Sequence, residues 1–110
     1  MTVSGGADAE NVGTISGSKV SMWEAKNDGF FQLQAQCQNP TNTTLKLELL
    51  APGNVLAAAV TPEGKLGDED GLRRLIWTIP VRKDDMVRLT LSSGELTLVK
   101  GQFIYFGVAE

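Results

Sequence analysis

The stretch that most constrains the fold is GFFQLQAQCQ, residues 29–38, because its side chains alternate strictly between apolar and polar. A period of two residues is the pattern of a β-strand with one dry face and one wet face. The dry positions are Phe31, Leu33, Ala35 and Cys37, and the wet positions are Gln32, Gln34, Gln36 and Gln38. We therefore expect a sheet that covers a hydrophobic core on one side only.

Shorter segments with strand-like patterns occur along the rest of the chain, separated by turn sequences such as NPTN, PGN, RKDD and SSG. They amount to about eight strands spaced roughly 8 to 12 residues apart, with no helical periodicity of useful length. One of them, VLAAAVT at 55–61, is expected to be buried on both faces. The pattern predicts an all-β protein, an antiparallel sandwich or barrel of about eight strands.

The beginning of the chain has a different character. Residues 1–18 are rich in glycine and small polar residues, and their larger apolar side chains are Val3, Val12 and Ile15. We expect a flexible N-terminal arm over 1–18 and one domain over 19–110. The three apolar residues are the candidates for anchoring the arm to a larger assembly.

Composition narrows the function. The 110 residues include no histidine and a single cysteine, Cys37, which removes the commonest general base and the Ser-His and Cys-His arrangements. We expect no catalytic residues, no cofactor and no metal site, and we interpret the acidic run Asp68-Glu69-Asp70 as a solvated loop. A net charge of -3 argues against nucleic acid as a partner. Without a visible signal peptide or membrane span, the expected place of synthesis is the cytoplasm, with no membrane partner.

The last ten residues, GQFIYFGVAE, carry apolar side chains on both faces of a short strand. We expect one set of these side chains to fill the core and the other set to need a partner. The two sets are Phe103 and Tyr105 on one face, and Ile104, Phe106 and Val108 on the other. Gly107 indicates the close approach of another backbone. The glutamines at 32, 34 and 36 form a polar but uncharged surface, which suits a subunit contact, although a neutral exposed sheet face is an equal alternative. The predicted trimer interface consists of Phe103, Tyr105, Phe106, Gly107, Gln32, Gln34 and Gln36.

Two segments also resemble a known superfamily. WTIPVRKDDMVRLTLSSG at 77–94, with Asp84 and Asp85 at its turn, and the closing Tyr105-Phe106-Gly107 resemble the last strands of the jelly-roll superfamily of tumour necrosis factor and the globular heads of complement and collagen-like proteins. The resemblance implies an eight-stranded jelly roll that assembles as a homotrimer, with its C-terminal strand near the threefold axis. Jelly rolls of this kind also recur in bacteriophage decoration proteins, spikes and fibre heads.

Three functional hypotheses follow. The first is a non-enzymatic structural subunit of a virion, a trimeric decoration or fibre protein that binds a major capsid protein or another virion protein. The alternative is a carbohydrate-binding module in which Trp23 and Trp77 stack on a glycan. The last is a small enzyme that uses only carboxylates, for instance Glu63 with Asp68 or Asp70.

Overall fold

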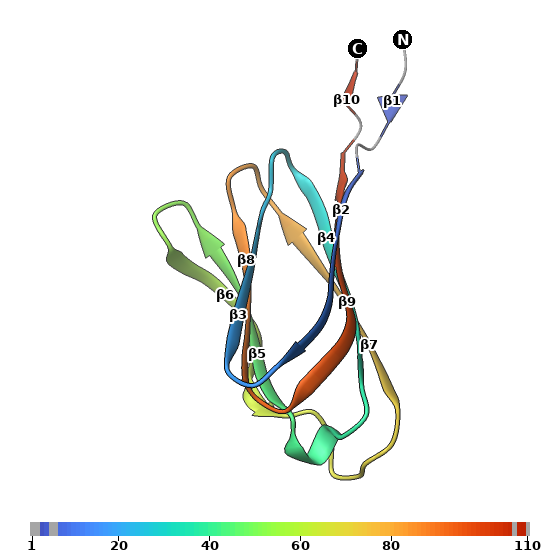
Figure 1. The fold of residues 1–110 in the computed structure, drawn as a ribbon. Coiled ribbons are helices and arrows are strands. Elements are labelled where there is room, and N and C mark those ends of the chain that lie inside the picture. The colour runs from blue at the N-terminus through green and yellow to red at the C-terminus, as the bar shows by residue number, and fades with distance from the viewer. Residues whose placement is uncertain (1–2, 5–6, 107, 110) are drawn as a thin grey trace.

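Two four-stranded antiparallel sheets face each other in the computed structural model, which describes residues 3–4, 7–106 and 108–109 (Figure 1). The first sheet has the order β2 (Ala7–Ser16), β9 (Glu95–Tyr105), β4 (Gly29–Cys37) and β7 (Arg73–Val81). The second has the order β3 (Lys19–Glu24), β8 (Met86–Ser93), β5 (Thr44–Ala51) and β6 (Val55–Lys65). A short strand pair, β1 (Val3–Ser4) and β10 (Val108–Ala109), extends beyond the sandwich, and one 3-10 turn, η1, spans Pro40–Asn42.

The strand order is that of a jelly roll. From β2 onward the chain alternates between the sheets, except at the β5–β6 hairpin, so β9 lies between β2 and β4 while β8 lies between β3 and β5. Strands distant in sequence therefore pair, as in two interlocked Greek keys. The predicted antiparallel jelly-roll sandwich is confirmed. Within the residues that the structure describes, no helix has the length and apolar character that a bilayer crossing requires.

The alternation in β4 orients its side chains as expected. Phe31, Leu33, Ala35 and Cys37 are buried between the sheets, whereas the glutamines of the same strand are half-buried on its outer face. Aromatic rings continue the core across both sheets, with ring centroids 5.1 Å apart for Trp23 and Phe31 and 4.8 Å apart for Phe31 and Phe103. Rings at these separations, tilted against each other, pack favourably.

The C-terminal half of the domain contains one long strand where the sequence indicates two. A turn is expected at Lys100-Gly101, but β9 runs without interruption from Glu95 to Tyr105. Gly101 is needed for the packing between the sheets and not for a turn. A Cβ at this position would lie 2.6 Å from Nε1 of Trp23 and 2.8 Å from Cζ of Phe31. The glycine leaves room for the indole of the opposite sheet.

Most of the predicted arm belongs to the sandwich. Residues 7–16 form β2, which pairs along β9 at the edge of the first sheet. The pairing shifts register on both sides of Gly13, whose φ is +78°, and these irregularities interrupt the alternation that would have indicated a strand. Ile15 is buried in the core and Val12 packs against it. The expectation of a flexible arm over 1–18 is therefore wrong for residues 7–16.

The segment 55–61 is a strand, but it is not buried on both faces. It belongs to β6, at the edge of the second sheet, and Val55 and Leu56 keep 60% and 55% of their surface exposed. β6 also continues through Pro62 to Lys65, although a proline followed by polar residues and a glycine is more typical of a loop. Pro62 is compatible with this position because an edge strand leaves half of its N–H groups without a ladder partner.

Replacement of Gly101 by alanine tests the contact between the sheets. The added Cβ meets the rigid indole of Trp23, so we expect Gly101→Ala to lower the free energy of unfolding by about 1–3 kcal/mol. Urea denaturation followed by circular dichroism measures the change. Gly64→Ala is the matched control, since no atom lies within 4 Å of a Cβ built on Gly64. Equal stability of the two variants would contradict the packing role of Gly101.

Candidate interaction surface

The outer face of the adjacent strands β9, β4 and β7 is a mostly uncharged surface, which we call the glutamine face. Its described side chains come from three adjacent strands: Phe30, Gln32, Gln34 and Gln36 on β4, Lys100, Gln102 and Ile104 on β9, and Arg74, Ile76 and Thr78 on β7. The register places Gln32 between Gln102 and Thr78, and Gln34 between Lys100 and Ile76. The glutamines therefore occupy the middle of the face.

Large apolar side chains flank these glutamines, Ile76 on β7 beside Gln34 and the pair Phe30 and Ile104 beyond Gln32. Ile76 is 65% exposed on one side, and Ile104 and Phe30 are 43% and 37% exposed on the other. Next to them Phe106, 57% exposed, meets Phe30 edge to face with ring centroids 5.4 Å apart. Apolar side chains gathered at the rims of an uncharged surface are typical of a contact surface rather than of a solvated one.

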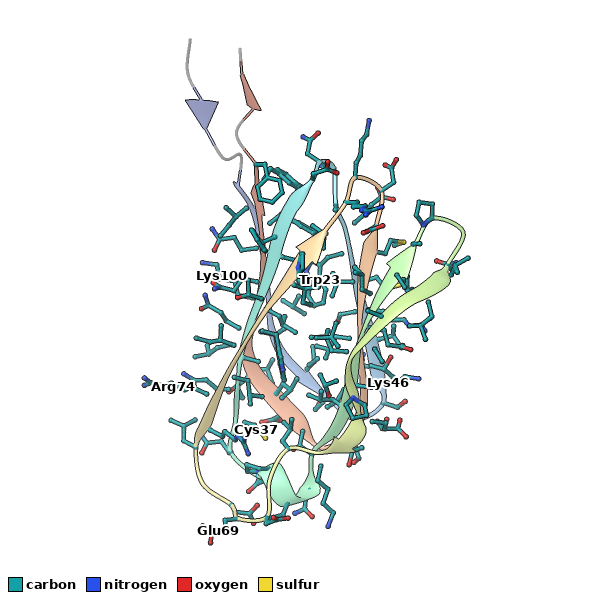
Figure 2. All side chains as sticks on the ribbon, turned by 180° about the vertical axis from the view of Figure 1, so that it is seen from behind. Trp23, Cys37, Lys46, Glu69, Arg74 and Lys100 are labelled. Atoms are coloured by element: carbon teal, nitrogen blue, oxygen red, sulfur yellow. The ribbon has the colours of Figure 1, made fainter. Side chains whose placement is uncertain are left out.

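The charges on the glutamine face have one sign. Arg74 and Lys100 point away from the sandwich on the same side, opposite to Lys46 (Figure 2). None of the side chains that define the face is a carboxylate. Gln34 donates a hydrogen bond from Nε2 to Oε1 of Gln32, at 2.8 Å, so two of the central amides are already ordered. Fewer rotamers then remain to be lost when a partner binds.

A shallow hollow of about 170 Å³ lies on this face between β4 and β7. Its outward-facing wall is formed by Gln34, Gln36, Arg74, Ile76 and Leu98. Leu98 is 60% exposed because β9 is irregular at this point, where its φ is +54° and the pairing with β4 shifts register. The bulge turns an apolar side chain outward, which the sequence pattern did not indicate.

The predicted trimer-interface residues divide into two groups in the structure. Phe103 and Tyr105 are 5% exposed and lie in the core, their rings stacked with centroids 5.7 Å apart, so they are wrong as surface residues. Phe106 is exposed, and Gly107 lies outside the described residues. Gln32, Gln34 and Gln36 lie on the outer face, half-buried. Of the two sets left open for the last strand, the one with Phe103 and Tyr105 fills the core.

A second surface feature is a cleft of about 440 Å³ at the open end of the sandwich, where the β5–β6 hairpin diverges from β7. Its walls are apolar, and include Leu49, Ala57, Pro80, Val81 and Phe106. Polar side chains at the cleft come from the turns on either side of it, and these are Asp28, Arg82 and Asp85. A volume of this order is in the range of small-molecule sites.

The two carboxylates of the cleft are held in place by the backbone. Asp85 Oδ2 accepts a hydrogen bond from the Arg82 N–H, and Asp28 Oδ1 accepts one from the Lys83 N–H, both at 2.9 Å. This turn is the one that the resemblance located at Asp84 and Asp85, and the φ of Asp84 is +73°. The other oxygen of Asp28 and of Asp85 has no protein hydrogen bond among the described residues.

The two tryptophans do not form a platform. Trp23 is 4% exposed and lies between the sheets, so it is wrong as a glycan contact (Figure 2). Trp77 is half-buried on the inward side of β7 and packs against the core. The anchoring residues Val12 and Ile15 are likewise engaged within the sandwich. Val3 lies in β1, which pairs with β10.

The acidic side chains considered for catalysis or metal binding have separate partners. Glu63 accepts a hydrogen bond from Ser92 Oγ, and Asp70 accepts one from Thr41 Oγ1. Glu48, which the sequence analysis did not single out, accepts two hydrogen bonds from Arg88, at 2.8 and 3.0 Å, on the outer face of the second sheet. In the part of the chain that the structure describes, no three His, Cys, Asp or Glu side chains gather as metal ligands would.

Comparisons with known proteins find similarity only at the level of structure. No protein-family model matches the chain, and no curated protein does either. The C-terminal CBM6 of the marine laminarinase LamC from Zobellia galactanivorans aligns with a TM-score of 0.47 and 9% identity, over 92% of this chain and 96% of that one. The module CBM6cm-2 of Cellvibrio mixtus lichenase 5A, solved with cellotriose, aligns with a TM-score of 0.45 and 11% identity, over 93% and 88%.

A phage protein is similar to a lesser degree. The enzymatically active domain of tailspike protein 4 from bacteriophage CBA120 aligns with a TM-score of 0.40 and 12% identity, over 93% of this chain but 19% of that one. TM-scores at this level say nothing of what this chain binds, and its jelly-roll fold rests on its own strand order. Kinship with the tumour necrosis factor and complement-head proteins stays a prediction.

Truncation of Trp23 separates a core role from a surface role. We expect Trp23→Ala to lower the free energy of unfolding by about 3–5 kcal/mol, because it removes a large side chain buried between the sheets. Ile76→Ala, on the glutamine face, should change it by less than about 0.5 kcal/mol. Thermal and urea denaturation of both variants provide the measurement. A Trp23→Ala protein as stable as the parent would contradict the burial of the indole.

Proposed function

We propose that this protein is a non-enzymatic structural subunit that assembles with copies of itself through the glutamine face. The observation that carries the proposal is the composition of that face, where amides lie beside exposed Ile76, Phe30 and Ile104 and none of the described side chains on β9, β4 and β7 that define the face is a carboxylate. Removing an amide from water costs less free energy than removing a charged group. Such a surface can be covered by a partner at a small desolvation penalty.

The proposed assembly is a homotrimer, as the sequence resemblance implies, and the proposed setting is a virion, as a capsid decoration or fibre subunit bound to a capsid or other virion protein. In a closed ring of three, each contact joins two different surfaces of neighbouring copies. Arg74 and Lys100 therefore need not face their own counterparts. The lack of histidine and the separate partners of Glu63 and Asp70 support a role without catalysis.

A charge at an exposed apolar position of the glutamine face tests this proposal. Ile76→Lys places a third cation beside Arg74 and Lys100, so we expect the subunits to dissociate at least about tenfold more readily, roughly 1.4 kcal/mol. Size-exclusion chromatography with light scattering measures the molar mass at micromolar concentrations. Leu72→Lys is the matched control, because Leu72 is 52% exposed but lies in the loop between β6 and β7. An unmodified protein that is monomeric under these conditions would refute self-assembly.

The cleft at the open end of the sandwich favours a second candidate function, carbohydrate binding. A sugar ring presents an apolar face and several hydroxyl groups, which suits a cleft that combines Phe106 with the side chains of Asp28, Arg82 and Asp85. Under this proposal the contact residues are those of the cleft, and the tryptophans contribute only to the core and its edge. Oriented carboxylates and an arginine would select the hydroxyl pattern.

Binding of oligosaccharides to cleft variants tests the second candidate. We expect Phe106→Ala and Arg82→Ala each to weaken binding at least about tenfold, because stacking and charge-assisted hydrogen bonds are lost. Isothermal titration with a panel of oligosaccharides that includes cellotriose gives the affinities. Val20→Ala, on the outer face of the second sheet, should bind as the parent does. No binding by the parent protein to any member of the panel would count against this function.

A further inference from the structure

The buried carboxylate of Asp85 has one oxygen that opens into the cleft. Asp85 is 8% exposed, and its Oδ2 accepts the hydrogen bond from the Arg82 N–H, whereas its other oxygen has no partner among the described residues. Of the described residues that are buried or half-buried, Trp23 Nε1 is the side-chain polar atom that is both fully buried and without a partner. The unbound oxygen of Asp85 is therefore reachable from the cleft that Asp85 lines. A cation placed there would compensate the carboxylate for the water that it has lost.

Asp28 brings a second carboxylate to the same part of the cleft. Its Oδ1 binds the N–H of Lys83, which directly follows Arg82, the residue whose N–H binds Asp85. Because the two carboxylates bind consecutive N–H groups of one turn and both line the cleft, they lie near each other in its wall. Among the described residues, neither carboxylate forms an ion pair with the Arg82 guanidinium. Their negative charge is available to a ligand.

The turn that holds these carboxylates is fixed to the sandwich. Asp84 has a φ of +73°, a conformation that aspartate and asparagine adopt more readily than most residues. Its N–H donates to the carbonyl of Ala25, and the Ala25 N–H donates to the carbonyl of Asp85, both at 2.8 Å. The Phe106 N–H donates to the carbonyl of Asp28 at 2.9 Å, which ties the aromatic wall to the same framework. The site is formed before a ligand arrives, so less conformational entropy is lost on binding.

Two carboxylates in an apolar cleft suit an ammonium group better than a metal ion. Ca²⁺ takes about six to eight oxygen ligands, and within the described ranges no three His, Cys, Asp or Glu side chains gather. An ammonium group carries only donors, and its hydrogen bonds to carboxylates are charge-assisted. The remaining walls are apolar and include the exposed ring of Phe106, which complements the apolar face of a sugar ring.

We propose that the cleft binds an amino sugar, with its ammonium group at the free oxygens of Asp85 and Asp28 and its ring against Phe106. This inference rests on the second candidate function, carbohydrate binding, and names the class of sugar. The exposed Arg82 side chain binds a neighbouring hydroxyl group of the sugar. A neutral sugar offers hydroxyl groups to the same carboxylates, but without the Coulomb attraction between two charged groups. The cleft therefore prefers a sugar with an amine to the same sugar with a hydroxyl group.

Binding of matched trisaccharides tests the preference. Cellotriose and the β-1,4-linked trimer of glucosamine share one sugar backbone and differ in having a hydroxyl group or an amine at carbon 2. Isothermal titration at about pH 6, where an amine of ordinary basicity is protonated, gives the affinities. We expect the full chain to bind the glucosamine trimer at least about tenfold more tightly than cellotriose. The N-acetylated trimer, whose amide carries no charge, should bind no better than cellotriose.

Matched variants locate the charge that the amine recognises. Asp85→Asn and Asp28→Asn should each reduce the preference for the glucosamine trimer at least about fivefold, because the amide oxygen keeps the hydrogen bond to the turn while the charge is lost. Asp84→Asn is the control, since it removes the same charge from the same turn at a residue that does not line the cleft. Asparagine also tolerates the positive φ of Asp84. If Asp85→Asn fails to fold by circular dichroism, the exposed Asp28 supplies the same comparison.

The possible outcomes separate this inference from the function on which it rests. A glucosamine trimer that binds no more tightly than the neutral oligosaccharides of the panel would overturn the inference and leave carbohydrate binding intact. A parent protein that binds no member of the panel would overturn both. A preference that survives both Asp85→Asn and Asp28→Asn, or that Asp84→Asn removes equally, would refute the site.

Discussion

The packing of Trp23 against Gly101 fixes how the two sheets meet. The indole comes from β3 in one sheet and fills the space that a side chain on β9 of the other sheet would need. Because successive residues of a strand point to opposite faces, this contact determines which residues of β9 face the core and which face outward. Phe103 is directed into the core and Ile104 outward. On β4 the same alternation buries Phe31 and Leu33 and directs Gln32 and Gln34 outward. The packing of the core therefore also determines which side chains form the glutamine face.

The jelly-roll order determines where the open edges lie. β6 and β7 are consecutive in the chain and each is the last strand of its sheet, so both free edges are at the same side of the sandwich. The cleft opens at this side, where the hairpin that contains β6 diverges from the end of β7. Neither the cleft nor the exposed edge follows from the local sequence of any one strand. They follow from which strand the topology leaves uncovered.

Local alternation was sufficient to predict the fold class and the orientation of β4. Where polar and apolar residues alternate strictly, the apolar set identifies the side of the strand that faces the core. It was insufficient at residues 7–16, where bulges around Gly13 interrupt the period, so the sequence pattern indicates a flexible arm in place of a strand. It also failed at 55–61, since an apolar pattern indicates burial without indicating what provides it. In the last strand both faces are apolar, so the sequence left two sets open; the Trp23 indole against Gly101 and the pairing of Phe31 with Phe103 select between them.

The candidate surface was predicted in part for the same reason. The glutamines at 32, 34 and 36 are on the outer face because their strand alternates cleanly. Leu98 was missed because its outward orientation depends on the bulge in β9. Ile76 was not included because only the pairing of β7 with β4 places it beside Gln34. The polar side chains of the cleft were missed because they come from separate turns that only the fold brings together.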